Sequence, residues 1–155
     1  MSATSKRLLY TLLLFASIIS KASADKAFIH PGLLHSRADL DRMEVAVAQK
    51  RTPIFEGFKV LSASPRSQAS YRRLGPFPEI GRAPTIRMSE AKSDAEAAYQ
   101  NALMWTITGE QAHADKAIEI IDAWVGSLKK VTGIDGVLAA GLQGFKFVNA
   151  AELLR

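Results

Sequence analysis

The chain has 155 residues, a formal net charge of +5 and no cysteine. The lack of cysteine excludes disulfide scaffolds, cysteine-based zinc sites and thiol catalysis. The length suits one domain with a hydrophobic core of its own.

The first 24 residues predict a signal peptide. Lys6 and Arg7 precede an apolar run over 8–19, and Ala-Ser-Ala at 22–24 fits the small-x-small rule for cleavage. The run is shorter than the roughly 20 residues that span a bilayer, so cleavage is favoured over a membrane anchor. The expected mature domain is 25–155, secreted or periplasmic, with no membrane attachment after cleavage.

Much of the positive charge lies in this leader. Removing Lys6, Arg7 and Lys21 lowers the 20 basic residues to 17 against 15 acidic ones, which leaves a net charge of +2. A charge this small gives little support to nucleic-acid binding, so no nucleic-acid partner is predicted. Without disulfides, the mature domain must be held together by core packing.

Two helices are expected at the start of the mature domain. Ser36 and Asp39 have capping-box spacing, and an apolar stripe follows to about Gln49 at Leu40, Met43 and Val47. Pro53 suits the first turn of a second, short helix, because its missing N–H has no partner there in any case. The apolar residues of this second helix are Ile54, Phe58 and Leu61.

Residues 63–92 show no periodicity and are expected to form a long loop, either a functional lid or a disordered segment. The loop is basic, with Arg66, Arg72, Arg73, Arg82, Arg87 and Lys92 against only Glu79 and Glu90. Arginine forks grip carboxylates with two donors, so an arginine-rich lid suits an acidic ligand. The alternative is a solvated loop whose charges serve solubility alone.

The segment 93–124 predicts two amphipathic helices joined by a turn. Ser93 and Glu96 have capping-box spacing, and Gly109 supplies the backbone freedom that a helix end needs. The expected inner face of the second helix is Ala114, Ala117, Ile118, Ile121, Trp124, Val125 and Leu128.

A final helix is expected from Val137 to Arg155. Apolar residues surround it on nearly every side, which is typical of a buried helix. Asn149, Glu152 and Arg155 form one polar stripe, which either lines a cleft or makes an internal hydrogen-bond network. No glycine, proline or cap follows Arg155, so we expect the sequence to be a fragment.

The predicted fold class is all-α, built from helical hairpins, because no run alternates over five or more residues as a strand would. His30, His35 and His113 lie far apart with no i, i+4 pairing, so no metal site is predicted.

Several segments resemble the alginate lyase family of polysaccharide lyases. They are DAEAAYQNALMWTITGEQAHADKAIEIIDAW at 94–124, AAGLQGFKFVNAAELLR at 139–155, HPGLLHSRADLDRM at 30–43 and EIGRAPTIR at 79–87. The resemblance covers essentially the whole mature chain and the N-terminal half of the family. It implies an (α/α) toroid, an incomplete ring of helical hairpins around a deep cleft that binds acidic polysaccharide.

The resemblance also implies β-elimination on alginate or a related polyuronate. The uronate carboxylate must be neutralised by donors such as Asn, His or Arg, which stabilises the developing enolate as an oxyanion hole would. A Tyr or His then removes the C5 proton, and an acid protonates the departing O4. No metal or other cofactor is implied.

The resemblance places the family's Asn-His pair and its later Arg and Tyr beyond Arg155, and the sequence contains no Asn-His dipeptide. We therefore predict no catalytic residue of the family in this chain, and residues 25–155 are expected to be inactive alone. By position and character, substrate binding is predicted for Tyr71, Arg72, Arg73, Arg87, Lys146 and Asn149.

Two other functions stay open. One is a non-catalytic secreted module that binds acidic glycan or a protein partner. The other is a tetratricopeptide-like scaffold, which the single helical hairpin at 99–121 suggests but no second repeat supports.

Overall fold

A computed structural model describes residues 28–155 of the chain, and the predicted signal peptide lies outside them. The described part is mostly helical, as expected. Its elements in chain order are α2 (Arg37–Ala48), α3 (Ile54–Ala63), the 3₁₀ turn η1 (Pro65–Ser67), β1 (Glu79–Gly81), α4 (Met88–Thr108), α5 (Gln111–Ser127), β2 (Lys130–Thr132) and α6 (Gly136–Leu153).

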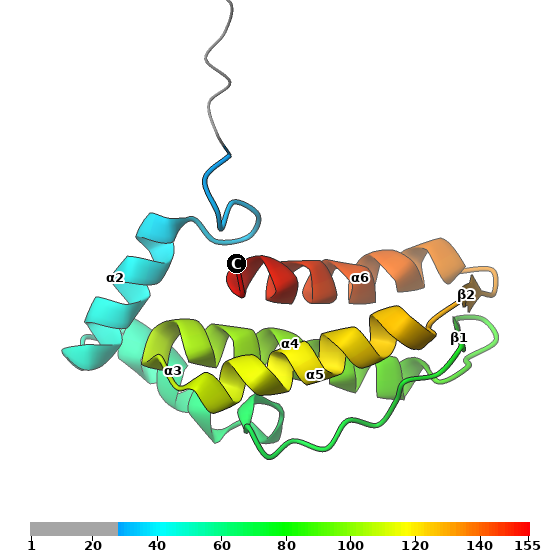
Figure 1. Ribbon diagram of the computed structural model, residues 1–155, viewed down its shortest axis with the longest axis horizontal. Coiled ribbons are helices and arrows are strands. Elements are labelled where there is room, and N and C mark those ends of the chain that lie inside the picture. The colour runs from blue at the N-terminus through cyan, green and yellow to red at the C-terminus, as the bar shows by residue number, and fades with distance from the viewer. Residues whose placement is uncertain (1–27) are drawn as a thin grey trace, which may run out of the picture.

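Helix α4 is the centre of the fold. It packs against both α5 and α6, whereas α5 and α6 contact each other far less. Helices α2 and α3 lie beside one end of this stack, and the two strands lie at the other end, where α6 begins (Figure 1). The three long helices therefore form a layered stack with different surroundings at its two ends.

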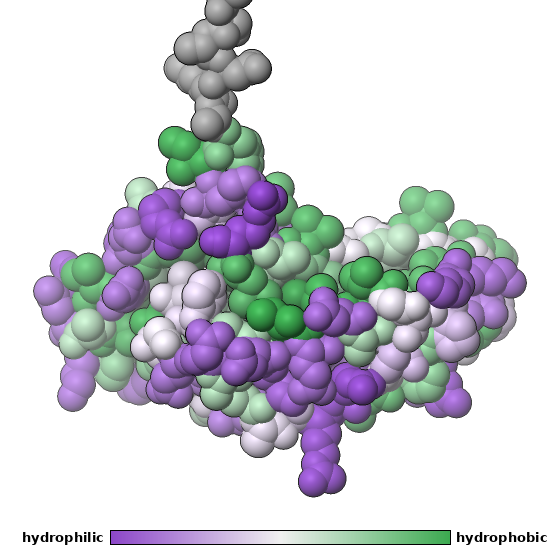
Figure 2. Space-filling view, in the orientation of Figure 1, coloured by the Kyte–Doolittle hydropathy of each residue, from purple (hydrophilic) through white to green (hydrophobic). Residues whose placement is uncertain are grey.

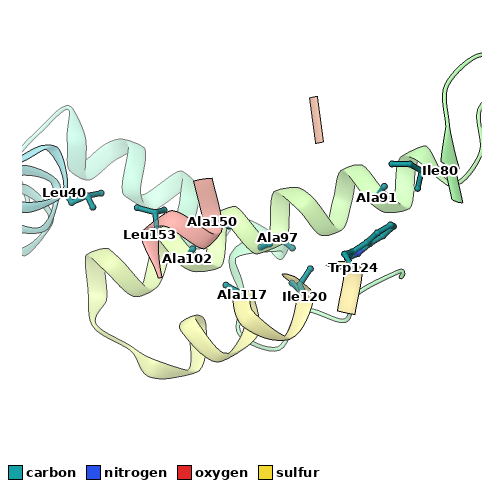
Figure 3. Close-up of a cluster of buried hydrophobic side chains, with 11 residues drawn as sticks. Leu40, Ile80, Ala91, Ala97, Ala102, Ala117, Ile120, Trp124, Ala150 and Leu153 are labelled. Atoms are coloured by element: carbon teal, nitrogen blue, oxygen red, sulfur yellow. The ribbon is translucent and has the colours of Figure 1, made fainter. Parts of the chain in front are cut away.

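Alanine makes this close packing possible. Five alanines of α4 are buried, and α5 and α6 add three more that are fully covered: Ala91, Ala95, Ala97, Ala98 and Ala102, then Ala117, Ala139 and Ala150. Small side chains let neighbouring helix axes approach closely, since the distance between axes depends on the residues at the contact. Larger residues, among them Leu40, Ile80, Ile120 and Trp124, fill the space around them (Figure 3).

The predicted helix starts were right for α2 and wrong for α4. Ser36 accepts from the Asp39 N–H and the Asp39 carboxylate accepts from the Ser36 N–H, which is the expected capping box. Helix α4 instead begins at Met88, after Arg87 in a left-handed conformation. Ser93 lies inside the helix, because the residues before it are also good helix formers and the spacing alone does not mark an end.

The predicted loop 63–92 is more ordered than expected. It contains η1, the strand β1 and the first turn of α4. Strand β1 pairs in parallel with β2, with Ile80 opposite Val131. Three-residue strands are too short to show alternation in a sequence, so periodicity did not reveal them.

The predicted inner face of α5 was partly wrong. His113, Ala114, Ala117, Ile120 and Trp124 are buried, whereas Ile118 is 43% exposed and Val125 is 75% exposed. Two adjacent apolar stripes run along this helix, and the stripe that contains Trp124 is the one that packs against α4.

Helix α6 was predicted to be buried all round, and this is also wrong. One face packs on α4 through Ala139, Gln143, Ala150 and Leu153, but Val137, Leu138, Leu142, Phe145 and Val148 are all exposed. Figure 2 shows hydrophobic side chains gathered over this helix, while polar side chains cover the lower edge of the same view. Within residues 28–155, no helix or strand covers this face of α6, and only Leu33 and Leu34 of the N-terminal segment lie beside Phe145 and Val148.

The carboxylate of Asp94 joins three segments in the interior. Its Oδ1 accepts from the Tyr71 hydroxyl at 2.9 Å and the Leu74 N–H at 2.8 Å. Its Oδ2 accepts from the Gly75 N–H and from Trp124 Nε1, both at 2.8 Å. Asp94 is fully buried, so these four donors replace the water that a carboxylate otherwise requires.

We predict that Asp94→Asn lowers the unfolding free energy by on the order of 3 kcal/mol, because in either orientation its amide nitrogen would face at least one N–H donor and the charge that strengthens the other hydrogen bonds would be lost. The measurement is urea denaturation of residues 25–155. Asp122→Asn, on the exposed side of α5, is the control and should change stability by about 0.5 kcal/mol or less. Equal stability of the two variants would contradict this role of Asp94.

Candidate functional site

The predicted residues Tyr71, Arg72 and Arg73 lie together in the segment between η1 and β1. Arg73 donates to the Gly75 carbonyl at 2.5 Å, and its Nε lies 3.4 Å from a Glu119 carboxylate oxygen. Arg72 is exposed, and no carboxylate among residues 28–155 lies within ion-pair distance of it. With Ser70, Lys116 and Glu119, the three line an open hollow of about 540 Å³ beside α5.

The Tyr71 hydroxyl donates its hydrogen bond to the Asp94 carboxylate. Burial raises the pKa of Tyr71 far above its usual range, and the hydrogen bond to Asp94 raises it further. The phenol therefore stays protonated at neutral pH and donates inward to the core. In this arrangement Tyr71 positions the loop that carries Arg72 and Arg73, and it is poorly suited to remove a proton from a substrate.

The other three predicted residues lie elsewhere. Arg87 pairs with Glu90 at 3.0 Å and lies 4.7 Å from the centre of the Phe77 ring. Asn149 accepts from the Leu34 N–H at 3.0 Å and donates to the Phe145 carbonyl at 2.8 Å. Asn149 thus belongs to an internal network that fastens the N-terminal segment to α6.

Glu152 completes that network. Its Oε1 lies 2.7 Å from His30 Nδ1 and accepts from the Gly32 N–H at 3.0 Å. The hydrogen bond to His30 lowers the pKa of Glu152, so this carboxyl stays charged at neutral pH. Of the two readings of the polar stripe on α6, the structure favours the internal network at Asn149 and Glu152.

Lys146 lies in a groove that the sequence did not reveal. This groove, here called the α4–α6 groove, has a volume of about 420 Å³ and is lined by Arg82, Thr85, Met88, Lys92, Leu142, Gln143 and Lys146. The turn after β1, the first two turns of α4 and the middle of α6 supply its walls. Three cations, a hydroxyl and a side-chain amide thus surround a partly apolar hollow.

Gly133 brings the turn before α6 against the Arg82 backbone. Its φ is +92°, a conformation that favours glycine, and a Cβ at this position would lie 1.9 Å from the Arg82 carbonyl oxygen. The Arg82 N–H donates to the Thr132 carbonyl at 3.0 Å, and the Asp135 N–H donates to the Arg82 carbonyl at 3.3 Å. The rim of the groove at Arg82 is therefore held by backbone contacts to the turn.

The charge of the groove is only partly neutralised. Arg82 Nε lies 3.5 Å from an Asp135 oxygen, and Lys146 Nζ lies 3.1 Å from Glu96, which also faces Arg66 at 3.4 Å. Lys92 is exposed and has no carboxylate at ion-pair distance within the described chain. The N-terminal end of α4 adds the positive end of a helix dipole. The groove is thus suited to a carboxylate that also carries hydroxyl groups.

The three histidines each have a different neighbour. His35 Nε2 lies 2.5 Å from the Tyr99 hydroxyl, and His113 Nδ1 lies 2.8 Å from Asn101 Oδ1, while His30 contacts Glu152. Burial lowers the pKa of His35 and raises that of Tyr99, so both are neutral near pH 7. Among residues 28–155 no group of three potential metal ligands occurs.

Comparison with known protein families, characterised proteins and solved structures finds no match to this chain. In the part of the chain that the structure describes, no helix has the length and apolar character required to cross a membrane.

We predict that the tyrosines of residues 25–155 ionise at higher pH in the folded protein than in the unfolded chain. Tyr71 and Tyr99 are the two tyrosines of this segment, and the pKa of each is raised above 10.0 by burial. Above about pH 10 the unfolded chain releases these protons first, so the unfolding free energy should fall as pH rises. Ultraviolet titration of phenolate, with and without urea, measures this. Coincident titration curves would contradict the assignment.

Proposed function

We propose that this chain is the N-terminal part of a secreted or periplasmic polysaccharide lyase of the alginate lyase type, in which it helps to hold an acidic polysaccharide. The observation that carries the proposal is the α4–α6 groove. It combines Arg82, Lys92 and Lys146 with Gln143 and Thr85, as a chain of carboxylated sugars requires. Cations recognise the carboxylates, while hydroxyl and amide groups match sugar hydroxyls.

The architecture supports this proposal in two ways. Helices α4 and α5 pack as antiparallel neighbours joined by a short turn, which is the building unit of an (α/α) toroid, and α6 then packs on α4 in the same direction as α4 (Figure 1). The uncovered apolar face of α6 is of the kind that packs on a further helix. In the proposed toroid another hairpin would cover that face, and the groove would border the central cleft.

The groove by itself lacks the groups for β-elimination. The reaction requires a base near C5 and an acid near O4, in addition to cations at the carboxylate. The groove is lined by three cations, one amide and one hydroxyl, and Tyr71 donates to Asp94 on another side of the molecule. We therefore propose that these residues bind the polymer and that the proton-transfer groups belong to another part of the enzyme.

A non-catalytic module that binds acidic glycan is the second candidate. Lys92, which has no carboxylate partner among residues 28–155, is compatible with this function, because binding of a polyanion requires no proton-transfer group. Both functions predict that the groove binds acidic glycan, and only the lyase predicts that the whole enzyme cleaves it. Binding and cleavage are therefore measured separately.

We predict that residues 25–155 bind alginate but not a neutral glucan, and that binding weakens with added salt because exposed charges are screened. Lys92→Ala should weaken binding roughly three- to tenfold, the effect of losing one exposed cation from a charged site. Lys59→Ala is the matched control, since Lys59 lies on α3 outside the groove and pairs with Glu56. Equal loss in both variants, or unchanged binding in Lys92→Ala, would argue against the groove.

The same preparation should form no unsaturated uronate from alginate, as ultraviolet absorbance of the product would report. Clear turnover would show that the chain holds its own proton-transfer groups, and the division of roles proposed above would then be wrong.

A further inference from the structure

A second cavity lies at the opposite end of α4 from the groove. It has a volume of about 320 Å³ and lies between α2, α3 and the end of α4. Its lining is Arg42, Met43, Val47, Ile54, Gly57, Phe58, Leu61, Leu103 and Ile107. The lining is apolar except for Arg42, and the volume lies within the range of about 300 to 1,000 Å³ that is usual for small-molecule sites.

Helix α3 leaves this cavity open. The helix has five large apolar residues, Ile54, Phe55, Phe58, Val60 and Leu61, yet none of its residues is buried. Gly57 lies in the wall, and a Cβ built there would meet no atom within 4 Å. Glycine destabilises a helix interior by about 1 kcal/mol relative to alanine, and no contact among the described residues requires glycine at position 57.

The apolar cavity adjoins a smaller hollow with a different lining. This hollow has a volume of about 180 Å³ and is lined by Arg42, Ala46, Arg51, Thr52 and Ile54. Arg42 and Ile54 belong to both linings, so the two hollows meet at these residues. An apolar chamber thus opens beside a pair of guanidinium groups.

The charge of this pair is not balanced within the described residues. Arg42 donates to the Asp39 carboxylate at 2.8 Å, which uses one of its terminal nitrogens. Arg51 is exposed, and no carboxylate of residues 28–155 lies at ion-pair distance from it. The Asp39 carboxylate therefore pairs with Arg42 alone, and an anionic group at the mouth of the cavity would balance the charge of Arg51.

We propose that the cavity binds an amphiphilic carboxylate of the medium-chain fatty-acid class. The hydrocarbon tail lies against the apolar residues of α2, α3 and α4, and the carboxylate contacts Arg42 and Arg51. This site is separate from the polyuronate groove, since Met88 and Ile107 are nineteen residues apart on α4, about 28 Å along the helix. The proposal does not depend on lyase activity.

The test is calorimetric titration of residues 25–155 with decanoate below its micellar concentration. Saturable binding near one molecule per chain is expected, and decanol, which lacks the charge, should bind at least about threefold more weakly. Gly57→Leu should fill the chamber and weaken decanoate binding at least about tenfold, while helicity stays unchanged because leucine favours helix.

Gly126→Leu on α5 is the matched control, because a Cβ at Gly126 also meets no atom within 4 Å. This variant should bind decanoate as the wild type does. Arg51→Gln, at an exposed position, should weaken decanoate binding about threefold and leave decanol binding unchanged. Absence of saturable binding, equal affinity of Gly57→Leu and Gly126→Leu, or equal affinity for decanoate and decanol would each overturn the proposal. None of these outcomes bears on alginate binding at the groove.

Discussion

The buried carboxylate of Asp94 is the interaction on which the rest of the structure depends. Both of its oxygens accept two hydrogen bonds, and the donors come from the irregular segment 71–75 and from Trp124 of α5. An uncompensated carboxylate in the interior would be strongly unfavourable, so these donors must be in place for the chain to pack. The Asp94 side chain thereby fixes α5 against α4. It also fixes the basic segment that carries Arg72 and Arg73.

The alanine-rich surface of α4 has a second consequence. Because small residues bring α6 close to α4, side chains from both helices meet along the line between them. Lys146 reaches Glu96 across this line, and Glu96 also faces Arg66 near η1. Farther toward the start of α4 this chain of ion pairs ends, and Lys92 is left without a partner among the described residues. The groove is positive for this reason.

The two ends of α4 differ in chemistry because different elements pack there. At its start, the strand pair and the turn at Gly133 place Arg82 against the first turns of the helix. At its end, α2 and α3 surround Leu103 and Ile107 with apolar side chains that fill the space incompletely. A charged polymer suits the first environment and an amphiphile suits the second, so the two proposed ligands do not compete for one surface.

The sequence by itself determined the helices of this protein. The apolar spacing, the Ser36–Asp39 capping box and the left-handed Gly109 are local features, and local hydrogen bonding and sterics decide them within a few residues. The start of α4 at Met88 was missed because helix-forming residues on both sides of Ser93 hide the boundary. Of the predicted site residues, Tyr71, Arg72 and Arg73 stay together because they are adjacent in the chain.

Only the tertiary structure decided the rest. The strand pair joins residues about 50 positions apart, and the groove unites Arg82 and Lys92 with Lys146, so neither leaves a pattern in any short stretch of sequence. The choice between two apolar stripes on α5 and the exposure of one apolar face of α6 depend on which neighbour is present. Periodicity shows that a face is apolar, but burial is a property of the pair of surfaces that meet.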